Sequence, residues 1–310
     1  MNDLKPINQI ELFGLNNFFN ELVKLDNLGK FPSKIFFSGQ KGIGKSTLAY
    51  HFINFVLSKN EKFSYDLSNL KINIENPSFR TVLNGSNPNF LLVDVNPEKK
   101  HIDINQIRNL ISSLTKSSFN SKPRFVLIDN IEFLNLNSIN ALLKIREEPS
   151  HNVHFILINN NKKILKTFSS RCLNFKIYLS NNQILEVSQK ILNNDLYEIV
   201  NKELINYYIT PGNIYNLVKF SVDNKYDLKD TSLKEFLKIL IKENHFKKNS
   251  SIKYLFYDLV EFYLSEINFS MASNIFDKYN YFLKRISEIR RFNLDEDSLF
   301  LEFNNEILNG

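Results

Sequence analysis

Residues 39–46 of the chain read Gly39-Gln40-Lys41-Gly42-Ile43-Gly44-Lys45-Ser46. This stretch fits the phosphate-binding loop pattern G-x-x-x-x-G-K-S/T. It follows a short apolar run at 34–38, which predicts a buried strand, and precedes a segment at 47–57 whose apolar residues share one helical face. In such a setting backbone N–H groups converge on a phosphate, and the helix N-terminus adds positive potential. The stretch therefore predicts an α/β fold organised around a nucleotide site.

The overall composition predicts a cytoplasmic globular protein. The 310 residues suffice for two or three domains, and the 43% hydrophobic content provides a core. No apolar run approaches the roughly 18 residues of a membrane span, and the N-terminus lacks the basic-then-apolar pattern of a signal peptide. The single cysteine, Cys172, excludes an internal disulfide and a cysteine zinc cluster.

The charge of the chain is only weak evidence for an anionic partner. The net charge is +6 and the pI is about 9.1. However, the chain is rich in the residues that AT-rich codons encode, and no basic block of five or six residues stands out. The five histidines show no metal-ligand spacing. Composition alone therefore selects no ligand class.

Strand-like and helix-like segments alternate as far as Tyr178. Strands are predicted at 34–38, 90–95, 124–129 and 153–158, and helices at 47–57, 104–116 and 137–148. This alternation predicts a parallel sheet with helices on both faces.

Beyond residue 179 the pattern becomes helical. Helices are predicted at 182–192, 194–209 and 213–222, a polar linker at 223–230, and amphipathic helices from 231 onward. An aromatic stretch at 254–263 has helical spacing and predicts core packing. We expect three domains: an α/β nucleotide-binding domain at 1–178, a small helical domain at 179–228 and an all-helical domain at 229–310.

The loop and one later acid predict a site for ATP and Mg²⁺. Lys45 would reach the outer phosphates, and the Ser46 hydroxyl would ligate Mg²⁺. Asp129 ends the most apolar strand and supplies the second acid that such a site needs. The candidate nucleotide-binding residues of the loop are Gly39, Gly42, Gly44, Lys45, Ser46 and Thr47.

The same region lacks the group that hydrolysis requires. Many ATPases with this loop carry a glutamate directly after the Mg²⁺-binding aspartate, but here that residue is Asn130, and an amide is not a base. Glu132 follows two residues later, and we expect it to point elsewhere. The chain is predicted to bind nucleotide and to hydrolyse it poorly.

A third candidate site is the run Ser169-Ser170-Arg171-Cys172. Arg171 could be a surface salt-bridge partner, or it could act as an arginine finger on a neighbouring subunit's nucleotide. The spacing of residues alone does not decide between these two roles.

Several motifs together resemble the clamp-loader branch of the AAA+ ATPases, tightly from Leu12 to Cys172 and more loosely beyond. The most specific are the Asn-Ala-Leu-Leu-Lys-x-x-Glu-Glu-Pro run at 140–149 and the triplet at 170–172. The others are Gly42–Ser46, Gly85–Phe90 and Ile128-Asp129.

Three departures resemble the stator-type subunits of that family rather than its motor subunits. The motor (gamma/tau) subunits carry a four-cysteine zinc module, an Asp-Glu pair and a lid arginine. This chain has no cysteine in that region, has Asn130 after Asp129, and has Asn216 near the position of the lid arginine. Many stator relatives have a degraded phosphate loop, whereas this loop is intact.

The resemblance implies an AAA+ module of RecA-like domain and helical lid, followed by a helical collar domain. It implies that Arg171 acts in trans as the arginine finger and that Asn159, to within one residue, is the nucleotide-sensing position. The implied partners are gamma/tau and delta subunits in a hetero-pentamer, with the sliding clamp and primed DNA contacted through the complex. The implied location is the nucleoid-associated replisome of DNA polymerase III.

Two alternatives remain at this stage. The chain could be an active motor ATPase of the same family, against which Asn130, Asn216 and the missing cysteines argue. It could also be an unrelated ATPase such as a helicase or a helicase loader, against which the Glu-Glu-Pro and Ser-Arg-Cys runs argue.

Overall fold

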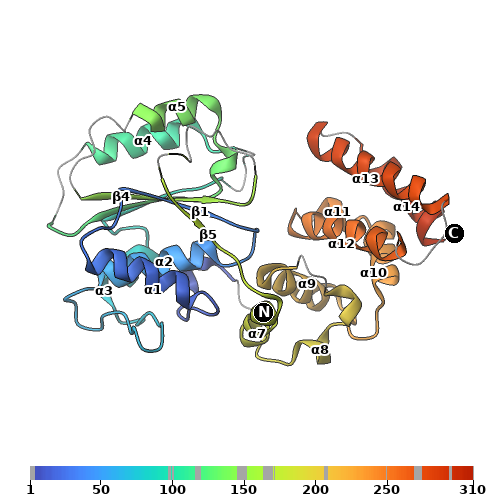
Figure 1. Cartoon of the computed structure of the whole chain (residues 1–310), viewed down its shortest axis with the longest axis horizontal. Coiled ribbons are helices and arrows are strands. Elements are labelled where there is room, and N and C mark those ends of the chain that lie inside the picture. Colours follow the sequence, from blue (N-terminus) through green and yellow to red (C-terminus); the bar gives the residue numbers. More distant parts are fainter. Residues whose placement is uncertain are drawn as a thin grey trace. The chain divides into compact units, whose positions relative to one another are not determined.

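A computed structural model provides the fold of the chain. It describes residues 4–96, 99, 101–115, 120–144, 152–162, 170, 172–205, 209–248, 250–268, 274–292 and 295–309. The chain divides into two compact units, Met1–Ile184 and Leu185–Gly310 (Figure 1). The division lies close to the predicted boundary at 178/179. The further boundary at 228/229 stays a prediction, because the helices on both of its sides belong to the second unit.

The first unit is built on a five-stranded parallel sheet in the order β2-β3-β4-β1-β5. The strands are β1 (Lys34–Ser38), β2 (Phe90–Val93), β3 (Arg124–Ile128), β4 (Val153–Asn159) and β5 (Leu173–Lys176). The central strands read as nearly continuous apolar runs because helices cover both faces of the sheet. The predicted α/β class is confirmed.

Helices form a layer on each face of this sheet (Figure 1). The helices α4 (Ile104–Leu114) and α5 (Leu136–Lys144) pack on each other over one face. The opposite face carries α1 (Asn16–Asn27), α2 (Lys45–Leu57) and α3 (Pro77–Leu83), with α2 packed against both α1 and α3. The described residues of this unit also include two short 3₁₀ turns, η1 (Pro6–Asn8) and η2 (Ile131–Phe133).

One strand and two α-helices of this unit, besides the two 3₁₀ turns, were not predicted from the sequence. The edge strand β5 buries only Phe175 among its four residues, so it lacks the apolar run that marks the central strands. Helix α1 is amphipathic and buries Phe19 and Leu22, and the short helix α3 begins with a side-chain cap, in which Asn76 accepts from the Phe79 N–H. The predicted helix at 137–148 is present as α5 up to Lys144, and its remainder lies outside the described residues.

The second unit is helical throughout its described residues. Its elements are α7 (Asn181–Leu192, which begins in the first unit), α8 (Leu196–Ile199), η3 (Lys202–Leu204), α9 (Pro211–Asn224), α10 (Leu233–Lys242), α11 (His245–Lys248), α12 (Ser250–Asn268), α13 (Asn274–Phe292), α14 (Asp297–Phe303) and η4 (Asn304–Leu308). The single helix predicted at 194–209 is wrong. Val200 is extended (φ −135°, ψ 131°), and Asn201 then starts η3.

Aromatic side chains pack among aliphatic ones in the core of this second unit. Phe246 stacks on Phe256 with ring centroids 5.3 Å apart, and Phe300 meets the edge of Phe256 at 4.6 Å. The helix α12, which carries the aromatic stretch predicted as core, packs against α9, α10, α11 and α13. The prediction that this stretch is core rather than a stacking surface for bases is confirmed by the burial of Phe256 and Tyr257.

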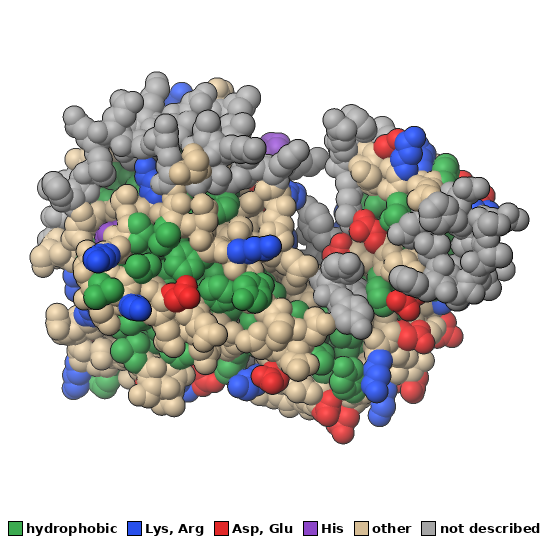
Figure 2. All heavy atoms as spheres, viewed as in Figure 1, with side chains coloured by type: hydrophobic (Ala, Val, Ile, Leu, Met, Phe, Trp, Pro, Cys, Tyr) green, Lys and Arg blue, Asp and Glu red, His purple; other side chains and the backbone are tan. Residues whose placement is uncertain are grey.

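The surface of the described residues carries charges of both signs. On the face seen in Figure 2, Lys and Arg side chains are interspersed with Asp and Glu side chains, and the described residues there form no basic block. Within the part of the chain that the structure describes, no helix combines the length and apolarity needed to cross a membrane.

Candidate nucleotide site

The predicted loop connects β1 to the N-terminus of α2. Gly44 is the N-cap of α2 with φ 100°, and Gly42 has φ 83°, both in the left-handed region that favours glycine. At Gly39 a Cβ atom would lie 2.4 Å from the carbonyl oxygen of Ile177, so no side chain fits there. Thr47 lies half-buried in the first turn of α2. The loop therefore has a geometric reason for glycine at three positions: backbone conformation at Gly42 and Gly44, and the close approach of Ile177 at Gly39.

Lys45 is buried at the centre of the loop, with 3% of its surface exposed. Its Nζ donates to the carbonyl oxygens of Gly39 (2.9 Å) and Gln40 (2.6 Å) and to Oδ1 of Asn160 (2.9 Å). These three acceptors match the three N–H donors of an ammonium group. Burial lowers the pKa of Lys45 to about 8, while the nearby carboxylates of Asp129 and Glu132 oppose this shift. The side chain is therefore still predominantly a cation at neutral pH.

Ser46 and Asp129 meet beside this lysine. The Ser46 hydroxyl donates to Oδ2 of Asp129 (2.5 Å), and Asp129 directly follows β3. Burial raises the pKa of Asp129 to about 6, and the neighbouring Asp94 adds to this effect. Three effects lower the pKa of Asp129 instead: the hydrogen bond from Ser46, the hydrogen bond from the Asn130 N–H, and the charge of Lys45.

A hydroxyl and a carboxylate are the hard oxygen ligands that Mg²⁺ prefers, so this pair fits the ion. Among the residues that the structure describes, no three His, Cys, Asp or Glu side chains gather closely enough to hold a metal ion. An Mg²⁺ held by Ser46 and Asp129 would therefore take its other ligands from phosphate and water.

Of the two asparagines at the end of β4, Asn160 reaches the loop. Its amide oxygen accepts from Lys45, whereas the Asn159 amide donates to the carbonyl oxygen of Lys162 (2.8 Å). The Asn159 Oδ1 atom is buried without a hydrogen-bond partner. We therefore move the proposed sensing role from Asn159 to Asn160.

Glu132 points toward the site, contrary to the sequence-based expectation. Asn130 adopts a left-handed conformation (φ 56°, ψ 47°), and the 3₁₀ turn η2 that follows folds Glu132 back. Its Oε1 accepts from the Asn160 Nδ2 (2.9 Å), and its Oε2 from the Asn160 N–H (3.4 Å). A carboxylate thus lies next to the residue that contacts Lys45.

Asp94 is a member of the site that the sequence reasoning missed. It follows β2, and the parallel register pairs Val93 with Ile128, so Asp94 and Asp129 leave neighbouring strands at the same level. The Asp94 Oδ1 accepts from the Asn130 Nδ2 (2.7 Å). The available signal was the shared position of the two acids at strand ends, because parallel strands present their carboxyl ends at one edge of a sheet.

The third predicted site is only partly described. Arg171 lies outside the described residues, as does the Glu-Glu-Pro run at 147–149. Beside Arg171, the thiol of Cys172 packs against the core cluster of the sheet, and burial raises its pKa. The role of Arg171 stays a prediction.

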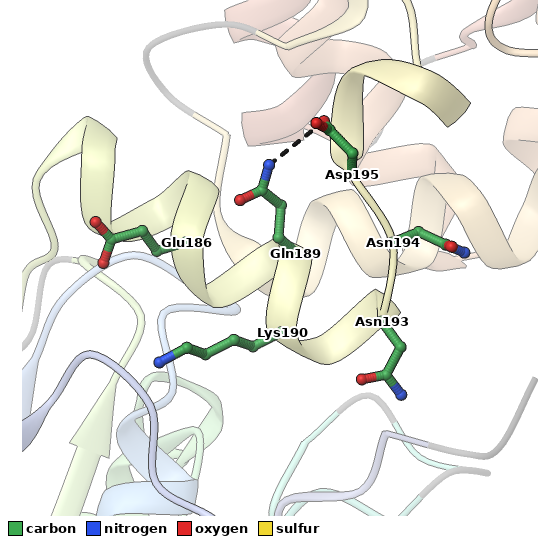
Figure 3. Close-up of a pocket in the computed structure, with 6 residues that line it drawn as sticks. All are labelled: Glu186, Gln189, Lys190, Asn193, Asn194 and Asp195. Atoms are coloured by element: carbon green, nitrogen blue, oxygen red, sulfur yellow. Dashed lines mark hydrogen bonds between the residues drawn. The ribbon is translucent and has the colours of Figure 1, made fainter.

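A separate open pocket lies in the second unit between α7 and α8 (Figure 3). Its lining is entirely polar and comprises Glu186, Gln189, Lys190, Asn193, Asn194 and Asp195. Gln189 donates to Asp195 across it (3.4 Å). None of the predicted nucleotide-binding residues lines this pocket.

This site lies within a region of the chain that matches a known protein family. A family model described as DNA polymerase III, delta subunit, matches residues 14–181, which is more than half of the chain. The chain belongs to this DNA polymerase III delta-subunit family. The matched region contains the loop, Asp129 and Asn160, and the predicted membership in the clamp-loader family is confirmed.

Relatives named as subunits of DNA polymerase III support the assignment. The gamma subunit of Buchnera aphidicola (Schizaphis graminum) is 30% identical over 54% of this chain and 44% of its own length. The delta' subunit of Pseudomonas aeruginosa is 28% identical over 44% of this chain and 40% of its own length. The delta' subunit of the same Buchnera strain is 24% identical over 87% of this chain and 84% of its own length. The match thus spans less than half of the first two relatives.

Two solved structures resemble the chain with lower sequence identity and with TM-scores below 0.5. A gamma-subunit-related protein of Thermotoga maritima has a TM-score of 0.40 and 19% identity, covering 93% of this chain and 92% of its own. The RuvB Holliday junction branch migration motor of the same organism has a TM-score of 0.42 and 14% identity, covering 78% of this chain and 81% of its own. At these scores neither structure adds to the assignment of the delta-subunit family.

Proposed function

We propose that the chain is a stator-type, delta-prime-like subunit of the replicative clamp loader that binds Mg·ATP and hydrolyses it slowly or not at all. One observation carries the proposal: the Lys45 ammonium lies in the loop and the Ser46 hydroxyl donates to Asp129, an arrangement suited to phosphate and Mg²⁺, while the position after Asp129 is occupied by an amide. Family membership supports the assignment to the clamp loader.

Binding would use the loop and its two neighbouring side chains. The N–H groups of the loop and the Lys45 ammonium would take the phosphates, with Lys45 exchanging its carbonyl partners for phosphate oxygens. Ser46 and Asp129 would hold Mg²⁺, which neutralises charge on the phosphates when bound.

Hydrolysis would be slow because the residue directly after Asp129 is not a base, and the two neighbouring carboxylates among the described residues already accept hydrogen bonds from protein groups. Asn130 is an amide, and Glu132 accepts two hydrogen bonds from Asn160. Asp94 accepts from Asn130 and from the Val95 N–H, so its Oδ1 is engaged as well.

The partners of the proposed complex are gamma/tau and delta subunits in a hetero-pentamer, with the sliding clamp and primed DNA reached through them. The helical second unit would supply the lid and the collar. Arg171 would act on the nucleotide of the adjacent motor subunit, and the complex would lie at the replisome.

An active motor ATPase is the second candidate, favoured by the completeness of the loop and by the relative named gamma. The two candidates differ in turnover. A motor should hydrolyse ATP at a rate typical of ATPases, above roughly 1 s⁻¹, whereas the proposed stator should not.

The test combines calorimetry and a steady-state ATPase assay on the purified chain. We expect the wild type to bind Mg·ATP and Lys45→Ala to lose binding, while Lys41→Ala, at an exposed position of the same loop, retains it. Absence of binding at millimolar ATP would disprove nucleotide binding. Turnover above roughly 1 s⁻¹ would select the motor. Failure to co-purify with gamma/tau and delta subunits would remove the chain from the clamp loader.

A further inference from the structure

A chain of hydrogen bonds runs from the phosphate loop across three neighbouring strand ends. Lys45 donates to Asn160 Oδ1 (2.9 Å), Asn160 Nδ2 donates to Asn130 Oδ1 (2.7 Å), and Asn130 Nδ2 donates to Asp94 Oδ1 (2.7 Å). Asp94, Asn130 and Asn160 follow the adjacent strands β2, β3 and β4. The three half-buried polar side chains therefore form one line that ends on the loop lysine.

The chemistry of the two ends fixes the direction of every bond in this line. An ammonium can only donate, and an ionised carboxylate can only accept. The Asn130 amide must therefore present its nitrogen to Asp94 and its oxygen to Asn160. The Asn160 amide must present its oxygen to Lys45, and the acceptor Glu132 on its nitrogen side enforces the same orientation.

The backbone places Asn130 in the middle of this line. Its left-handed conformation is one that asparagine adopts more readily than most residues, and it turns the chain into η2 immediately after the Mg²⁺-binding position. Residue 130 is thus suited both to the turn and to bridging an acceptor and a donor.

We propose that Asn130 is a positioning residue of the nucleotide site: anchored on Asp94, it fixes the Asn160 amide so that its oxygen holds the Lys45 ammonium at the loop. This inference deepens the proposed function and rests on it for the nucleotide readout. It gives the Asn130 amide a role of its own, in addition to the lack of a catalytic carboxylate at that position.

A carboxylate at position 130 cannot replace the Asn130 amide in this line of hydrogen bonds while Asp94 is present. Asn130→Asp has almost the same shape, but it places two acceptors at the 2.7 Å contact and leaves no donor between them. Combining it with Asp94→Asn restores a donor, since the introduced amide at 94 can donate to the introduced carboxylate at 130. The Val95 N–H also donates to Asp94 Oδ1 (2.6 Å), so this exchange should restore most of the line but not all of it.

The experiment is a double-mutant cycle on the full chain, comparing wild type, Asn130→Asp, Asp94→Asn and the combined exchange. The readouts are the thermal midpoint without nucleotide and the dissociation constant for Mg·ATP. Asn130→Asp should lower the midpoint by roughly 5 °C and weaken Mg·ATP binding about tenfold or more. Asp94→Asn should have a smaller effect on both than Asn130→Asp has, because an amide oxygen at residue 94 can still accept from Asn130. The exchange should recover more than half of each loss.

Asn20→Asp is the matched control, since it adds the same charge on the exposed surface of α1. A control as damaging as Asn130→Asp, or an exchange no better than Asn130→Asp alone, would overturn the proposal. If Asn130→Asp yields no folded protein, recovery of folded protein by the exchange supports the proposal, and its absence overturns it. If the wild type binds no Mg·ATP, the proposed function fails, and the thermal midpoints alone decide the role of Asn130.

Discussion

The buried histidine of α2 should make the stability of the first unit depend on pH. His51 has no exposed surface, and its Nε2 faces the carbonyl oxygen of Gln9 (3.1 Å) while its Nδ1 faces the Tyr65 hydroxyl (2.8 Å). A carbonyl only accepts, so Nε2 carries the proton and the tyrosine donates to Nδ1. Burial lowers the pKa of His51 from 6.5 to about 4, against a smaller opposite effect of the bond to Gln9.

The sign and size of this pH effect on the free energy of unfolding follow from proton linkage. The unfolded chain binds a proton at this histidine below pH 6.5, whereas the folded chain does not until about pH 4. The free energy of unfolding therefore falls as pH drops from 6.5 to 4. The full shift corresponds to about 3.4 kcal/mol, of which about 3 kcal/mol is lost by pH 4.

The wild-type profile alone does not isolate this effect, because Asp129 acts with the opposite sign. Its pKa is raised to about 6, so its protonation favours the folded state as pH falls below 6. The measured quantity is therefore the difference in the free energy of unfolding between wild type and His51→Gln, at several pH values between 7.5 and 4. The proteins are unfolded with urea, and the unfolding of α2 is monitored by the hydrogen exchange of its peptides.

The stability advantage of wild type over His51→Gln should shrink by about 3 kcal/mol across that range. The control is His101→Gln, at an exposed histidine of the same unit, which should follow the wild-type profile. A difference between wild type and His51→Gln that stays constant with pH would refute the reasoning.

Two further predictions concern the loop and the arginine. Gly39→Ala should lower the thermal midpoint of the chain more than Gly29→Ala does, because the new Cβ at residue 39 would meet the Ile177 carbonyl oxygen at 2.4 Å. Gly29 is the control, since it has a positive φ (62°) but nothing within 4 Å of its Cβ position. Equal losses in the two variants would mean that the loop relaxes around the contact. Arg171→Ala should leave assembly intact and reduce the DNA- and clamp-stimulated ATPase of a reconstituted loader, and Arg171→Lys should not restore it, since fingers of this kind contribute on the order of 10³–10⁵ in rate where they are the main one. Arg108→Ala, at an exposed position of α4, is the control, and unchanged ATPase in Arg171→Ala would return that residue to an ordinary surface role.

The parts of the fold that were predictable are those whose signal is local. The strand β1, the glycine loop and α2 form one continuous pattern, so their order and chemistry follow from residues 34–57. The edge strand β5 was missed because a single buried side chain gives no period. The predicted helix at 194–209 failed because Val200 and Asn201 break it for reasons of backbone conformation that apolar spacing does not show.

The site was predictable where one residue had one possible role. Lys45, Ser46 and Asp129 could be placed because the loop pattern and the strand end determine them. Asn159 and Asn160 could not be separated, because two consecutive asparagines point to opposite sides at a strand end and only the register of β4 decides which one faces the loop. Contacts between strands, such as that of Asn130 with Asp94, require the strand order, which local patterns do not provide.

The geometry of residue 130 bears on how binding and hydrolysis can separate in one site. The groups proposed to bind phosphate and Mg²⁺ lie in the loop after β1, in the first turn of α2 and directly after β3, and none of them forms a hydrogen bond with Asp94 in the described residues. The amide that stands in place of a base is instead bonded to the neighbouring strand ends on both sides. Introducing a carboxylate there alone would set it against Asp94 before it could act on water. If the proposed function holds, Asn130→Asp alone is therefore expected not to convert binding into hydrolysis, because the donor lost at residue 130 has to be supplied from residue 94.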